Sequence, residues 1–392
     1  MADRTEVSRF LRSLRIGACA AAVVTLAGHQ AQAETFGLVM TSFHTAGPFT
    51  KDGKVECPNG FNANNEENFK AQFKTPEEQQ TILHKYGSSQ WHYRGPNGES
   101  DTYSPEAVDD PLPHYEGRGT ASEGFNLDGT QDGAATNKTC KHDKFVNAAG
   151  EAVDNQFFRV AGCTKAFRPN EGTYDGFINM EIPQLVVNRW LIEVTGVDSR
   201  VNDSHVDITI AHGLDKLVPD GNDSFVAGRS QRIDEGSASY IQHTTGRIEN
   251  GVLITDPMPE LRMTASALIE VGERRYKDAR FRLKLTANGA TGVLAGYSDV
   301  ERMWRFYAKT LGVHGVAAQV SMPSIYKSMV RNADGYKNPA TGKCTAISQV
   351  FAVDFVNANI VRQSASTEVA AAIFKGTEVA ATDVLRGQEQ SK

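Results

Sequence analysis

Short runs of β-forming residues recur between residues 182 and 297, and Gly, Asn and Asp separate one run from the next. The runs cover residues 185–195, 205–211, 224–233, 239–248, 251–255, 262–272, 279–287 and 291–297. In the run 279–287, Phe and Leu alternate with Arg, Lys and Thr, which gives a strand one apolar and one polar face. Asn288-Gly289 then favours a tight turn into the next run. The pattern predicts an antiparallel β-sheet or sandwich.

Two capping boxes each mark the start of a predicted helix. Thr75 pairs with Glu78 ahead of residues 76–86, and a second box at Ser298 precedes residues 299–311, where apolar side chains recur at helical spacing. A short helix at 324–331, a strand at 346–356 and a helix-prone stretch at 367–385 are predicted to follow.

The predicted elements divide the chain into four regions. These are a signal peptide (1–33), a loop-rich region (34–174), an antiparallel β domain with packed helices (175–360) and a helix-prone tail (361–392). The loop-rich region has many Gly, Asn, Asp and Pro residues and no long periodic runs. The expected fold class is therefore mainly β with α elements, with flanking helices and a loop-rich N-terminal region held by disulfides.

The N-terminus has the three parts of a secretory signal peptide. Arginines precede an apolar run at residues 16–28, and Ala31-Gln32-Ala33 supplies the pattern of small residues that a signal peptidase needs. A membrane anchor is the alternative, but the run is shorter than the roughly 20 residues of a spanning helix. We expect cleavage after Ala33 and a periplasmic or secreted protein.

Cysteine usage agrees with export. Cys19 lies in the expected signal peptide, which leaves Cys57, Cys140, Cys163 and Cys344. An even number in an oxidising compartment favours two disulfides, for which several pairings are open. Closure of the shorter loop favours Cys140 with Cys163 and leaves Cys57 to pair with Cys344. A zinc site is disfavoured, because the chain has no Cys-x-x-Cys pair.

Asn126, Asp128 and Asp132 place side-chain oxygens at the spacing of a calcium-binding loop. Hard oxygen donors suit Ca²⁺, although this loop lacks the bidentate Glu of an EF-hand and needs further ligands, such as Asp143 or Asp154. The alternative is a surface turn rich in Asn and Asp.

The same spacing recurs at Asn332, Asp334 and Asn338. One carboxylate with two amides is a weaker set of ligands for Ca²⁺, and the alternative is a polar turn after a helix.

A histidine pattern gives a second candidate site. His205 and Asp207 share one face of a predicted strand, and His212 follows just past its end. Such a group can hold a transition metal or form an acid–base pair. Solvated polar side chains on an amphipathic strand are the alternative.

Trp91, His92, Tyr93 and Arg94 form an aromatic and basic cluster in the loop-rich region. Flat rings beside hydrogen-bonding groups are typical of sites for sugars or aromatic ligands. The alternative is that these side chains anchor loops on the core.

Charge and motifs exclude several classes of function. The 41 Lys and Arg residues against 47 Asp and Glu give a net charge of −6, so nucleic acid is not an expected partner. The chain has no serine-hydrolase elbow, zinc-protease motif, haem attachment motif, phosphate loop or complete dinucleotide fingerprint. No haem, nucleotide or flavin is expected, and no long apolar stretch after residue 33 indicates a membrane span.

Three segments carry a resemblance. Residues 153–156 leading to Gly162-Cys163, residues 341–348 and residues 292–297 resemble exported proteins of Gram-negative bacteria for which no activity is known. The resemblance implies export and implies no catalytic residues.

Two hypotheses for function follow. The first is a calcium-stabilised binding or surface accessory protein with a small-molecule, glycan or envelope partner. The second is a secreted hydrolase or lyase that acts on a polysaccharide or another polymer.

Overall fold

The computed structural model of the chain describes residues 33–73, 75–86, 94–185, 188–222, 224–267, 270–310 and 320–363. These residues belong to one compact unit. The expected signal peptide before Ala33, most of the predicted tail, and Trp91, His92 and Tyr93 lie outside the described residues.

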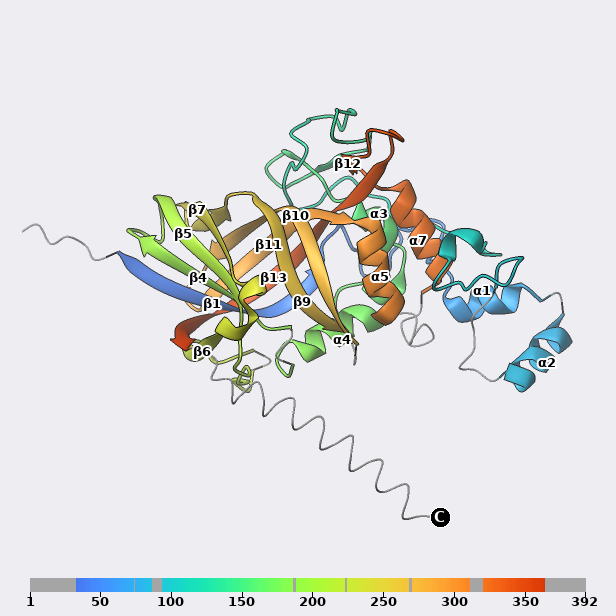
Figure 1. Ribbon diagram of the computed structural model, residues 1–392, viewed down its shortest axis with the longest axis horizontal. Helices are drawn as coiled ribbons and strands as arrows, with labels where there is room; N and C mark the ends of the chain where they lie inside the picture. The colour runs from blue at the N-terminus through green and yellow to red at the C-terminus, as the bar shows by residue number, and fades with distance from the viewer. Residues whose placement is uncertain are drawn as a thin grey trace, which may run out of the picture. The chain divides into compact units, whose positions relative to one another are not determined.

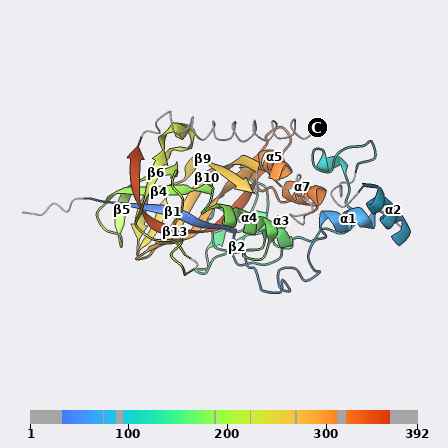
Figure 2. The ribbon, with the colours of Figure 1, turned by 90° about the horizontal axis from the view of Figure 1, so that it is seen from below.

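Eight strands of the main sheet form a closed ring. In ring order they are β1 (Glu34–Thr45), β4 (Trp190–Val197), β5 (Asp203–His212), β7 (Gln242–Glu249), β8 (Val252–Thr255), β10 (Glu270–Leu285), β11 (Gly289–Asp299) and β13 (Cys344–Gln363). Each strand is antiparallel to the next, and β1 pairs with both β4 and β13, so the sheet closes on itself. In Figures 1 and 2, β1 in blue lies beside β13 in red. The prediction of a mainly β, antiparallel fold is confirmed.

Further strands extend this ring. β9 (Met258–Ala267) pairs with β10, β12 (Gly335–Lys337) pairs with β13, and β6 (Arg229–Asp234) runs parallel to the end of β13. β2 (Phe145–Val146) and β3 (Ala152–Val153) form a separate two-stranded sheet.

The predicted single strand at 262–272 is wrong, because this stretch contains the end of β9 and the start of β10, which pair antiparallel. Residues 265–271 contain no Gly, Asn, Asp or Pro, so the sequence carries no signal for the reversal.

The outer edge of β9 is closed by side chains instead of a further strand. The amide of Gln242 bonds both the backbone N–H (2.7 Å) and the carbonyl (2.9 Å) of Arg262. The amide of Asn188 makes the same two bonds to Ser266, at 2.6 and 3.2 Å. The indole of Trp190 donates to the carbonyl between them, at 3.3 Å.

Of the eight ring strands, β1 is the one that the sequence did not predict. It falls in the expected loop-rich region, yet it pairs with β4 on one edge and with β13 on the other. Its neighbouring residues Leu38, Val39 and Met40 are all buried. A strand buried on both faces shows no alternation of apolar and polar residues, which explains why the pattern was missed.

The structure also contains short helices. They are α1 (Asn65–Ala71), α2 (Pro76–Tyr86), α3 (Phe157–Ala161), α4 (Thr173–Glu181), α5 (Val300–Thr310) and α7 (Met322–Arg331). Single 3₁₀ turns lie at Pro105–Ala107 and Lys165–Phe167, and two turns joined by a kink at Ser237 cover Glu235–Tyr240. In the part of the chain that the structure describes, none of the helices has both the length and the apolar character needed to cross a bilayer.

Helix α2 has its predicted bounds and its predicted capping box. The Thr75 hydroxyl accepts from the N–H of Glu78, whose carboxylate accepts from the N–H of Thr75, at 3.2 and 3.3 Å. α5 also forms as predicted, but its cap is Asp299, which accepts from the N–H of Arg302 at 3.0 Å. The side chain of Ser298 instead donates to a β10 carbonyl, so Ser298 is not the cap.

One hydrophobic core joins the ring and the helices. Each of the eight ring strands contributes buried apolar side chains, and α3, α4, α5 and α7 add theirs to the same cluster. These four helices gather at one end of the ring (Figures 1 and 2). Residues from β1, near the start of the described chain, and from β13, at its end, thus pack into the same core.

The structure contains two disulfides, Cys57–Cys163 and Cys140–Cys344, with Cα–Cα distances of 5.5 and 6.0 Å. The predicted pairing of Cys140 with Cys163 and of Cys57 with Cys344 is wrong. The entropy cost of closing a loop rises only slowly with loop length, so the shorter loop gains little over the longer one. The pairing of distant strands therefore decides which cysteines meet. Here the hairpin of β12 and β13 brings Cys344 to Cys140, whose N–H donates to Asp334 in that hairpin at 2.8 Å. Disulfides fit an oxidising compartment outside the cytoplasm.

Replacing both Cys140 and Cys344 by Ser should lower the free energy of unfolding by about 5 kcal/mol, because this bond spans 204 residues. Denaturant unfolding of the purified protein measures the loss. Peptide mapping without reductant provides the control, and a peptide that links Cys140 to Cys163 would contradict the observed pairing.

Candidate functional site

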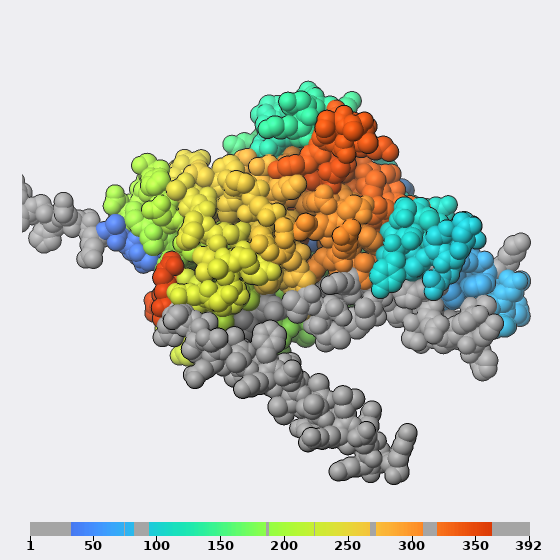
Figure 3. All heavy atoms as spheres, viewed as in Figure 1, coloured from blue at the N-terminus to red at the C-terminus, as the bar shows by residue number. Residues whose placement is uncertain are grey.

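A buried ionic cluster lies where four loop segments meet. It consists of Asp128, His142, Lys144, Asp154 and Asp334, and no more than 6% of any of these side chains is exposed. Asp128 comes from the candidate calcium loop, and His142 and Lys144 lie just before β2. Asp154 directly follows β3, and Asp334 directly precedes β12. Figure 3 shows the green loop region packed beside the red hairpin that carries Asp334.

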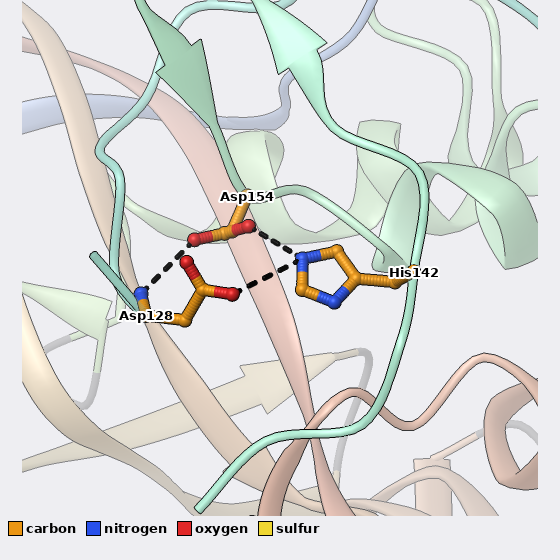
Figure 4. A group of neighbouring side chains, drawn as sticks. All are labelled: Asp128, His142 and Asp154. Atoms are coloured by element: carbon orange, nitrogen blue, oxygen red, sulfur yellow. Dashed lines mark hydrogen bonds and ion pairs between the residues drawn. The ribbon is translucent and has the colours of Figure 1, made fainter. Parts of the chain in front are cut away.

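His142 contacts the carboxylates of the cluster, and Figure 4 shows one of its ring nitrogens facing Asp128 and Asp154. Its Nε2 is 2.8 Å from Oδ1 of Asp154, 3.7 Å from Oδ2 of Asp128 and 3.9 Å from Oδ2 of Asp334. Its Nδ1 lies 2.9 Å from the carbonyl of Cys140, which can only accept a hydrogen bond. With an ionised carboxylate at Nε2 as well, both ring nitrogens face acceptors, so the ring carries both protons in this arrangement.

The electrostatics agree with this protonation. Burial alone would lower the pKa of His142, but the hydrogen bond to Asp154 and the charge of Asp334 outweigh burial and raise the pKa to about 9. Burial likewise opposes ionisation of Asp154, yet hydrogen bonds from His142 and Lys144 hold its pKa below the usual value. Burial raises the pKa of Asp334 to about 7.

Lys144 bridges two of the carboxylates. Its Nζ lies 2.5 Å from Oδ1 of Asp128 and 2.5 Å from Oδ1 of Asp154. It also donates to the side-chain oxygen of Asn126, at 3.2 Å. An ammonium group therefore contacts two of the oxygens that the sequence analysis assigned to calcium. The third, on Asp132, lies on the surface and accepts from the N–H of Ala134.

The three side chains of the second candidate calcium loop, Asn332, Asp334 and Asn338, lie in different surroundings. Asp334 enters the buried cluster, whereas the amide of Asn332 donates to Glu116 at 3.0 Å. The side chain of Asn338 is exposed and accepts from the N–H of Ala340. The three residues do not converge on one point.

The residues of the histidine pattern lie on opposite faces of β5. His205 and Asp207 lie on its exposed face, 3.7 Å apart and each about two-thirds exposed. His212 is buried on the opposite face, where Nε2 contacts the Thr264 hydroxyl at 3.2 Å and the ring packs against Trp190. The structure therefore does not assemble these three residues.

Of the aromatic and basic cluster, only Arg94 is described. It is exposed and forms an isolated bridge with Ser100. The prediction for Trp91, His92 and Tyr93 lies outside the described residues.

A cleft of about 1090 Å³ opens beside the ionic cluster, and His142 forms part of its wall. We call it the basic cleft, because it is lined by Arg118, Lys141, Arg159 and Arg331 against the acids Glu116 and Asp143. Arg331 pairs with Glu116 at 3.1 Å, and Arg159 donates to two loop carbonyls. Arg118 and Lys141 are exposed, and among the described residues neither has an ion-pair partner.

The sequence analysis missed His142 and Lys144. The signal was present in Lys141-His142-Asp143-Lys144, because alternate residues of an extended segment point to the same side. His142 and Lys144 thus turn together toward the buried carboxylates. What the sequence could not supply was the position of Asp154 and Asp334 opposite them.

Comparisons of the chain with protein-family models, with curated protein sequences and with solved structures find no match.

Replacing Lys144 by Met should lower the free energy of unfolding by about 3 kcal/mol, because two buried carboxylates then lose the cation between them. Chemical denaturation at neutral pH measures the change. Lys138→Met is the matched control, because Lys138 is exposed on the same loop. A loss at position 144 no larger than at position 138 would show that the bridge contributes nothing.

His114, in the wall of the basic cleft, should make stability depend on pH. Burial and the charge of Arg331 lower its pKa to about 4. Between pH 6.5 and 4 the unfolded chain therefore gains a proton that the folded protein does not, and stability falls as the pH falls. From pH 7 to 5, wild type should lose about 2 kcal/mol relative to His114→Gln in denaturant unfolding. Parallel pH curves for the two proteins would refute the assignment.

Proposed function

We propose that the chain is an exported binding protein that holds a carboxylate-bearing ligand in the basic cleft. The observation that carries the proposal is the pair of exposed cations Arg118 and Lys141, which have no ion-pair partner among the described residues and lie in a cleft that also contains Arg159 and Arg331. They concentrate positive charge in a chain whose net charge is −6. A cleft in which positive charges outnumber negative ones attracts anionic ligands.

The walls of the cleft are held in place before any ligand arrives. Cys57 and Cys163, which form one disulfide, both line it, and His142 ties another wall to the buried cluster. Arg159 fixes the loop at residues 117–119 by donating to two of its carbonyls, at 3.0 and 3.1 Å. Such preorganisation reduces the ordering cost of binding.

The size and donors of the cleft indicate the class of ligand. About 1090 Å³ is at the upper end of the volumes that small-molecule sites have, which suits a chain of several rings better than one small anion. Guanidinium groups match the planar fork of a carboxylate. An acidic oligosaccharide built from uronic acids has both several rings and carboxylate groups.

Export is the second part of the proposal. It rests on the predicted signal peptide with cleavage after Ala33, and the two disulfides support a location in the periplasm or outside the cell.

Titration calorimetry of the purified mature protein with trigalacturonate tests the binding function. We expect binding that weakens as salt is raised, and no binding of uncharged maltotriose. Arg118→Glu with Lys141→Glu should weaken binding about 100-fold, since two charge-assisted contacts are lost. The matched control is Lys216→Glu with Arg229→Glu, two exposed cations outside the cleft. Equal affinities for the two double variants would reject the basic cleft as the site.

A hydrolase or lyase is the second candidate, because the carboxylates of Glu116 and Asp143 line the same cleft. Release of new sugar ends from the same oligosaccharide would favour it, provided that Glu116→Gln with Asp143→Asn abolishes turnover and retains binding. Binding without turnover favours the binding protein.

A further inference from the structure

Three donor atoms of the ionic cluster, one each from Asp128, His142 and Asp154, lie close together, and an oxygen of Asp334 lies near His142. Nε2 of His142 lies 2.8, 3.7 and 3.9 Å from one oxygen each of Asp154, Asp128 and Asp334. Asp128, His142 and Asp154 each place one ligand atom within 4.8 Å of the other two. Nitrogen and oxygen donors lie about 2.0–2.2 Å from a bound zinc ion, so neighbouring donors in a coordination sphere are separated by roughly these distances.

Asp334 supplies an independent sign that a partner belongs there. Its Oδ1 accepts from the N–H of Ser348 at 2.7 Å, but its Oδ2 has no hydrogen-bond partner among the described residues. The residue is only 1% exposed. A buried carboxylate oxygen without a donor is costly, and Oδ2 is the atom that faces His142.

Lys144 contacts one of the three oxygens that face His142. That oxygen is Oδ1 of Asp154, whereas Asp128, which Lys144 contacts through Oδ1, and Asp334 face His142 with their Oδ2 oxygens. When His142 is neutral, three ionised carboxylates and one ammonium group leave two negative charges in a buried space. One divalent cation would neutralise them.

The surroundings also prepare His142 and Asp154 to act as ligands. A proton on Nδ1 bonded to the Cys140 carbonyl directs Nε2 toward the carboxylates, and the backbone there is fixed by the disulfide to Cys344. The second oxygen of Asp154 accepts from the N–H groups of Leu127 and Asp128, at 2.7 and 3.2 Å. Such outer contacts orient metal ligands in proteins.

We infer that Asp128, His142, Asp154 and Asp334 form a binding site for a divalent transition metal ion of the zinc or manganese class. The ion takes the place of the proton on Nε2, and the protonated cluster described above is the metal-free form. An imidazole among the ligands favours this class, since Ca²⁺ binds oxygen donors alone. The site therefore differs in both ligands and ion from the calcium loop expected at Asn126, Asp128 and Asp132.

Metal analysis of the purified mature protein, followed by chelation and titration with Zn²⁺, Mn²⁺ and Ca²⁺, tests the inference. We expect one equivalent of Zn²⁺ or Mn²⁺ to bind and to raise the melting temperature, and Ca²⁺ to do neither. Co²⁺ in place of zinc should give visible absorption bands that His142→Asn removes. Binding of Ca²⁺ alone, or of none of these ions to natively folded protein, would overturn the site.

Asp334→Asn separates the metal site from a structural role. The amide keeps the size of the side chain and the acceptor for Ser348, so the metal-free protein should keep its melting temperature, while affinity for Zn²⁺ should fall at least tenfold. Asp132→Asn is the matched control, because Asp132 belongs to the calcium hypothesis and not to the cluster. Loss of metal affinity at position 132 but not at position 334 would overturn the inference.

Discussion

The backbone hydrogen bonds of β13 are the interactions on which the rest of the molecule depends. This strand pairs with β1 along one edge and with β11 along the other, so it closes the ring and joins the two ends of the described chain. Its first residues pair with β12 and thereby place Asp334 and Cys344 against the loop region. Ser348 of β13 then bonds both Asp334 and the N–H of Gln156 at the start of α3. Closure of the sheet and assembly of the ionic cluster are thus consequences of the same strand.

Local signals were sufficient for much of the fold. The hairpin of β10 and β11 and helix α2 formed where alternation, a turn dipeptide and a capping box predicted them. These elements depend on residues near one another in the sequence. β1 and the two disulfides depend on partners more than a hundred residues away, and a pattern read along the chain contains no information about those partners.

The site shows the same division between local and distant information. Both oxygen-rich loops were recognised, and each contributes to the cluster its middle residue, Asp128 or Asp334. Their outer residues, such as Asp132 and Asn338, instead cap turns at the surface. The sequence could identify the carboxylates but not that the two loops converge on one histidine, because the hairpin of β12 and β13 and the Cys140–Cys344 bond bring them together.

The side chains along the outer edge of β9 have a consequence for how copies of the protein meet. An open strand edge offers unpaired N–H and carbonyl groups to any extended chain that approaches it, and sheets can then grow from one molecule into the next. Gln242 and Asn188 already occupy both groups at two positions of this edge, and Trp190 occupies the carbonyl between them. These three side chains occupy the backbone groups that a neighbouring strand would bond, and so they protect the protein from aggregation through this edge.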